Sequence, residues 1–143
     1  MKFIKLPILV AGIVIATAFA PFALAHDDAT LDKVKAPHGG QLRMAGANHY
    51  ELVVVRDSKS AKENAVVVYV TDHAGTRIPT TGATGSVTLL SGKDKAVSAL
   101  TPDGDNGMKG KAMYASTPDL KAVVKIKLAG QDEQQARFTP LGD

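Results

Sequence analysis

Short runs of alternating apolar and polar residues dominate the chain from Gln41 to its end. Such runs, bounded by Gly, Pro, Asn and Asp, are typical of β-strands joined by turns. No segment after residue 37 carries the apolar stripe of an amphipathic helix. The pattern predicts an all-β protein, and we favour an antiparallel Greek-key sandwich of immunoglobulin-like style over its alternative, a small β-barrel. Seven or eight short strands are expected, at Gln41–Ala45, His49–Arg56, Ala65–Thr71, Ser86–Leu90, Ala96–Leu100, Met108–Tyr114, Leu120–Leu128 and Gln135–Thr139.

Residues 46–48 separate the first two of these strands and predict a three-residue hairpin loop. In the register that this loop sets, Leu42 lies opposite Leu52 on an apolar face. Arg43 then lies opposite Glu51 on the other face, as an opposite-charge pair of the kind that cross-strand packing favours.

The first 25 residues have the features of a secretory signal peptide. Lys2 and Lys5 precede an apolar run, and Ala23-Leu24-Ala25 is a small-x-small cleavage site. The competing interpretation, a membrane anchor, requires the same run to span a bilayer. We expect cleavage after Ala25, a flexible arm over residues 26–37 and a β-domain over residues 38–143. The mature protein is then exported and soluble, and a bacterial periplasm is its simplest location.

Composition and charge exclude several classes of function. Removing the signal peptide leaves 15 of the 17 basic residues and all 14 acidic ones, so the mature charge is 15 − 14 = +1. The net charge of a nearly neutral domain does not attract it to nucleic acid or to an anionic membrane. The chain has no cysteine, which excludes disulfides, thiolate nucleophiles and iron–sulfur sites. It also lacks a nucleophile elbow, a phosphate loop and a dinucleotide fingerprint, so we expect no enzymatic activity.

Three histidines of the mature domain lie near expected turns or strand ends. For each of them, the alternative to metal binding is an exposed side chain without a special role. His38 follows Pro37 and precedes two glycines, which free the backbone beside the imidazole for close approach to a bound ion. His49 and Glu51 project from one face of a strand, about 6–7 Å apart, as a nitrogen and an oxygen donor. His73 falls in a turn and is interpreted as exposed.

The fourth histidine, His26, becomes the first residue if cleavage follows Ala25. Its α-amine and imidazole then form a chelate, and imidazole suits copper and nickel well. The alternative is that this N-terminal tail binds no metal.

Several segments together resemble a set of small exported proteins that accompany heavy-metal efflux systems. The segments are Pro37–Gly40, His49–Val54 and Val68–Gly75, and the first is similar to a Pro-His-Gly-Gly motif in periplasmic adaptor subunits of such pumps. The resemblance implies a periplasmic role in handling copper or related divalent metals, with His38, His49 and Glu51 as site residues. A second, weaker resemblance is to periplasmic copper carriers with an N-terminal histidine, which implies a role for His26.

The sequence thus predicts a periplasmic metal-binding or metal-delivery protein associated with metal efflux or resistance. Copper is the expected ion, and zinc, nickel, cobalt or no metal at all are the alternatives. The metal ligands are expected to be drawn from His38, His49, Glu51 and His26. The competing hypothesis is a metal-free interaction module that binds an efflux adaptor or another envelope protein.

Overall fold

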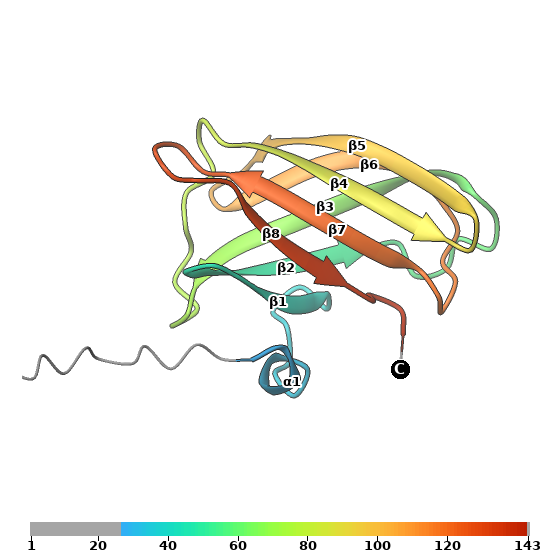
Figure 1. Ribbon diagram of the computed structural model, residues 1–143, viewed down its shortest axis with the longest axis horizontal. Coiled ribbons are helices and arrows are strands. Elements are labelled where there is room, and N and C mark those ends of the chain that lie inside the picture. Colours follow the sequence, from blue (N-terminus) through green and yellow to red (C-terminus); the bar gives the residue numbers. More distant parts are fainter. Residues whose placement is uncertain (1–26, 143) are drawn as a thin grey trace, which may run out of the picture.

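A computed structural model describes residues 27–142, so the expected signal peptide and His26 lie outside the described residues. Between residues 27 and 142 the chain forms one short helix and eight antiparallel strands (Figure 1). In chain order they are α1 (Asp28–Leu31), β1 (Gln41–Ala45), β2 (Asn48–Val54), β3 (Lys62–Asp72), β4 (Thr84–Ser91), β5 (Asp94–Asp103), β6 (Gly107–Tyr114), β7 (Lys121–Lys127) and β8 (Gln134–Phe138). The all-β prediction is confirmed. The same part of the chain contains no helix with the length and apolar character needed to cross a bilayer.

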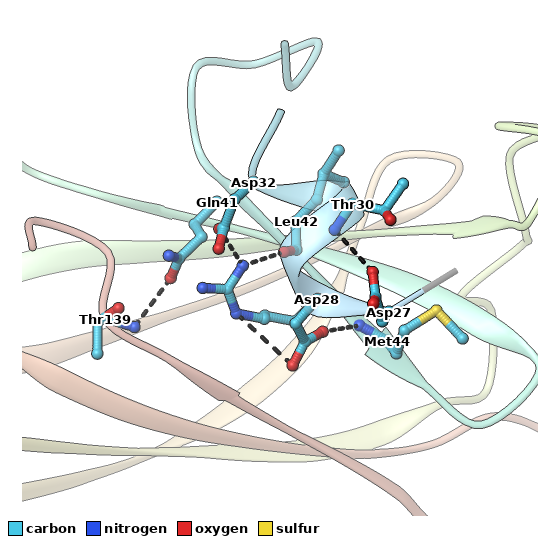
Figure 2. Close-up of polar contacts among 9 residues, drawn as sticks. Asp27, Asp28, Thr30, Asp32, Gln41, Leu42, Met44 and Thr139 are labelled. Carbon is cyan, nitrogen blue, oxygen red and sulfur yellow. Dashed lines mark hydrogen bonds and ion pairs between the residues drawn. The ribbon is translucent and has the colours of Figure 1, made fainter. Parts of the chain in front are cut away.

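The strands form one sheet in the order β1-β2-β3-β6-β5-β4-β7-β8, which curls until it is nearly closed. Of the two architectures expected from the sequence, the barrel is the one that fits. The end strands β1 and β8 lie beside each other without a backbone ladder between them. A side chain bridges this seam, because Gln41 Oε1 accepts a hydrogen bond from the Thr139 N–H at 2.8 Å (Figure 2).

The inward positions of the strands fill the interior of the barrel with apolar side chains. Alternation puts every second residue of a strand on the same face, so the pattern read from the sequence accounts for the core. The largest side chains that are less than 2 % exposed are Tyr50, Leu52, Leu89, Leu100, Met108, Leu120, Ile126, Val66, Val68, Val70, Val87 and Val124.

The predicted register of the first hairpin is wrong by one residue. Ala45 pairs with Asn48 and not with His49, so the loop has two residues, Gly46 and Ala47. Gly46 has φ +60°, while no non-glycine residue in the described chain has positive φ. Glycine with positive φ at the first of two loop residues is typical of a type II′ turn, whose twist matches that of the flanking strands.

The corrected register separates the residues that were expected to pair. Arg43 lies opposite Tyr50 and Leu42 lies opposite Glu51, so the predicted Arg43–Glu51 pair does not form. Leu52 is fully buried in the barrel core, whereas Leu42 belongs to a small apolar cluster outside it. The outward face of β1 and β2 is therefore not a solvated surface.

The segment that covers this outward face, residues 27–37, is called the strap below. The segment expected to be a flexible arm thus contains α1 and packs against β1 (Figure 1). Asp27 caps α1 by accepting the Thr30 N–H at 2.8 Å, as N-cap aspartates do. Leu31 and Ala36 are buried with Leu42 in the outer cluster.

Two aspartates fasten the strap to β1. Asp32 Oδ1 accepts a hydrogen bond from Arg43 Nη1 at 2.6 Å, and Asp28 Oδ2 lies 3.9 Å from Arg43 Nε. Asp28 Oδ1 also accepts the backbone N–H of Met44 at 3.1 Å (Figure 2). Arg43 is only 8 % exposed, so its charge is shielded from water and compensated by these carboxylates.

Candidate metal site

A cavity of about 530 Å³ lies between the strap, the outward face of β2 and β3, and the turn that follows β3. Three histidines and one carboxylate line it: His38, His49, His73 and Glu51. Apolar residues and Tyr69 form much of the remaining wall, and Lys35 and Arg77 also line it. We call this cavity the histidine pocket.

Glu51 fixes the position of His38 at one end of the pocket. Its Oε1 accepts the backbone N–H groups of His38 at 2.8 Å and of Gly40 at 3.0 Å, and its Oε2 lies 2.8 Å from His38 Nδ1. Glu51 is only 3 % exposed, so this carboxylate is held in the protein interior by its hydrogen bonds. The ring of His38 also stacks on Tyr69, with centroids 3.6 Å apart and an interplanar angle of 12°.

This arrangement leaves His38 Nε2 as the nitrogen that does not face the carboxylate. When Nδ1 donates its hydrogen to Glu51, Nε2 carries the lone pair that can bind an ion. A carboxylate that orients a histidine in this way is the common outer partner of metal-binding imidazoles. Both carboxylate oxygens of Glu51 already contact His38 or Gly40. Glu51 is therefore better suited to orient His38 than to bind a metal ion directly.

The two glycines after His38 have separate roles. Gly39 has φ +73°, a conformation that favours glycine. A Cβ at Gly40 would collide with the backbone carbonyl oxygen of Leu52. The close approach that Gly40 permits is therefore to β2, and it brings the N–H groups of His38 and Gly40 to Glu51.

His49 and His73 face each other at the other end of the pocket. Their ring centroids are 4.7 Å apart and the rings are tilted by 58°. His49 lies on β2, two residues before Glu51, and is 6 % exposed. Its cross-strand neighbour on β3 is Thr71, and His73 follows two residues later in the turn.

Asp72 builds the turn that presents His73. Its Oδ1 accepts the backbone N–H groups of Ala74 and Thr76, both at 2.8 Å. These bonds, first that from Thr76, lower the pKa of the Asp72 carboxyl below its ordinary value, and the nearby His73 adds to the effect. Such an aspartate-stabilised turn fixes the backbone on both sides of the histidine.

The spacing of the His49–His73 pair fits a shared ion. With metal–nitrogen bonds of about 2.0 Å, two imidazoles bound at about 90–110° have ring centroids roughly 4.5–5.2 Å apart. The observed 4.7 Å lies in this range. Within residues 27–142, however, no group of three or more His, Cys, Asp or Glu side chains is arranged to hold a metal ion. The described residues thus offer two imidazoles at a suitable spacing, and a complete coordination sphere needs further donors.

The structure brings together some of the predicted site residues and adds one that the sequence did not indicate. His38 and Glu51 are in direct contact, and His49 lines the same pocket, whereas His26 lies outside the described residues. His73, which was interpreted as an exposed turn residue, is paired with His49. Its place near His49 follows from the register of β2 and β3, which sets His49 beside Thr71.

No family model matches the sequence, and the searches of curated proteins and of solved structures found no match to it.

Proposed function

We propose that this is an exported metal-binding or metal-delivery protein that holds copper, or a related divalent ion, in the histidine pocket. The observation that carries the proposal is the His49–His73 pair, whose rings lie 4.7 Å apart in a largely apolar cavity. The orientation of His38 by Glu51 in the same cavity supports it. Imidazole nitrogens suit copper, zinc and nickel, and the Irving–Williams order favours copper among them.

His26 is the proposed source of the missing donors. Asp28 bonds to the backbone of Met44, and Met44 is the cross-strand partner of His49. The described chain begins at Asp27, one residue after His26, and Thr30 and Leu31 of α1 line the histidine pocket. A processed terminus at His26 supplies an α-amine and an imidazole, which with His49 and His73 make four nitrogen donors. Such a set suits the tetragonal preference of Cu(II).

Assignment to metal efflux or resistance in the periplasm rests on the sequence resemblance and the expected signal peptide. It is the proposed setting for the site. The protein would there sequester the ion or pass it to an envelope partner, without chemical change to the ion.

The proposal is tested by titrating Cu(II) and Zn(II) into mature protein whose intact mass begins at His26, in competition with a chelator of known affinity. The four histidines provide an internally matched series of single His→Gln variants. We expect His49→Gln and His73→Gln each to weaken copper binding at least about tenfold, a loss of about 1.4 kcal/mol. Circular dichroism of each variant controls for folding.

Three results would count against the proposal or change it. If only His26→Gln weakens binding, the site is the terminal chelate and the pocket is not involved. If only His38→Gln does so, the His49–His73 pair is not the core of the site. If no divalent metal binds below about 100 μM, the metal-free interaction module becomes the better account.

A further inference from the structure

The outward face of β4, β7 and β8 carries four cations and no acid. Alternation along β7 and β8 buries every second residue and leaves Lys121, Lys125, Lys127 and Arg137 exposed. The outward positions of β4 hold only uncharged residues: Thr84, Ser86, Thr88 and Leu90. The three strands lie side by side on one side of the molecule (Figure 1). We call Lys121, Lys125, Lys127 and Arg137 the basic face.

None of these four cations takes part in the ion pairs formed among residues 27–142. Arg137 lies opposite Val123, between Lys121 and Lys125, so like charges are neighbours on the sheet. Such juxtaposition is unfavourable. The net charge of the mature chain is only +1. The basic face is therefore a local concentration of positive charge on a nearly neutral protein.

A hollow of about 250 Å³ lies within this face. Leu90, Val123 and Phe138 contribute apolar surface to it, and Lys121 and Arg137 stand at its margin. Arg43 also lines the hollow, but its guanidinium is engaged by the aspartates of the strap. The hollow therefore combines room for an apolar side chain with two cations that form no ion pair among residues 27–142, although the charge of Lys121 contributes to lowering the pKa of the Asp119 carboxyl.

We propose that the basic face binds an acidic, extended segment of a partner protein, with one apolar side chain of that segment in the hollow. Successive outward residues of β7 are about 6–7 Å apart, which is also the spacing of alternate side chains in an extended peptide. A segment with carboxylates at every second position can therefore match the cations along β7. The strand spacing and the partly apolar hollow favour an extended peptide over a nucleic acid or a membrane surface. This proposal does not depend on metal binding.

The test uses a fluorescent synthetic peptide of alternating Glu and Ser with one central Leu, and the complete mature protein. We expect binding at low salt that weakens as ionic strength rises, because exposed charges are screened. The double variant Lys121→Glu/Arg137→Glu should bind at least about tenfold more weakly. The control Lys59→Glu/Lys62→Glu makes the same change in net charge at exposed positions away from the basic face, and should change affinity less than about twofold.

Equal weakening by both double variants would overturn the proposal, since only net charge would then matter. So would the absence of peptide binding below about 1 mM. Binding to phosphatidylglycerol vesicles that requires Lys121 and Arg137, without peptide binding, would assign the face to a membrane instead. If the charge-reversed protein does not fold, the Lys121→Gln/Arg137→Gln and Lys59→Gln/Lys62→Gln pair gives the same comparison. Copper affinity should be the same in all these variants, which keeps this test separate from that of the histidine pocket.

Discussion

Glu51 is the residue on which the geometry of His38 depends. Its buried carboxylate accepts three hydrogen bonds from His38 and Gly40, and no other element supplies an acceptor for these groups in the described contacts. These donors are part-buried and the His38 side chain is 38 % exposed, and hydrogen bonds to a charged group contribute about 1.5–3 kcal/mol each. The carboxylate thus links the stability of the strap end to the orientation of the imidazole.

We expect Glu51→Ala to lower the free energy of unfolding by roughly 2–5 kcal/mol, measured by urea denaturation. Glu63→Ala is the matched control, because Glu63 is exposed and lies 3.4 Å from an exposed Lys111, a pair worth less than about 1 kcal/mol. Equal losses in the two variants would contradict the role assigned to Glu51.

At the scale of single residues, the sequence singled out His38, His49 and Glu51 but not how they combine. The Pro-His-Gly-Gly motif drew attention to His38, whereas its bond to Glu51 depends on the path of the strap across β2. The pairing of His73 with His49 depends on the β2–β3 register, which a single sequence does not specify. Residue type and local spacing do not contain that information.

Among the elements, the first hairpin shows that an error of one residue in the predicted register changes the residues assigned to both faces of a strand. Because side chains alternate, a shift of one residue moved Leu42 out of the expected apolar face and removed the Arg43–Glu51 pair. Glycine followed by alanine at residues 46 and 47 is a sequence pattern typical of a two-residue type II′ loop, and the three-residue prediction did not take it into account. The apolar layer under the strap includes Leu42 and Met44, so the outward face of β1 also looks like a core face in the sequence.

Arg43 is predicted to hold the strap over the histidine pocket. We expect Arg43→Gln to speed amide hydrogen exchange of Leu31 and Val34 about tenfold or more, because its bonds to Asp32 and Asp28 are lost. Core amides such as that of Val68 should exchange as before, since the barrel does not depend on this contact. Lys111→Gln, at an exposed ion pair, is the control. Unchanged exchange in the strap would show that apolar packing alone holds it.

For the whole molecule, alternation and turn residues were sufficient to predict an all-β chain and most of the strands. They did not decide between a sandwich and a barrel, because both place every second residue in a core. The outcome depends on long-range pairings, of β3 with β6 and of β5 with β6, which join the two halves of the sheet. Local sequence pattern does not encode which distant strands become neighbours.

The barrel is predicted to lose stability in alkaline solution. Burial, with a contribution from the charge of Glu133, raises the pKa of Tyr50 to about 12 from an ordinary value of 10.0. The folded state thus favours the neutral phenol, so this contribution to stability is complete below about pH 10 and is lost as pH rises towards about 12. Urea denaturation at pH 8 to 11 should show the decline, and Tyr50→Phe should reduce it. An identical decline in Tyr50→Phe would contradict this assignment.

In the proposed function, imidazoles of the histidine pocket bind one metal ion together. Pulsed electron paramagnetic resonance of the mature protein with one equivalent of Cu(II) tests it most directly, because nitrogen modulation counts the coordinated imidazoles. We expect at least two imidazoles on the ion, and one fewer in each of His49→Gln and His73→Gln. A spectrum that both substitutions leave unchanged, or one without any coordinated imidazole, would contradict it.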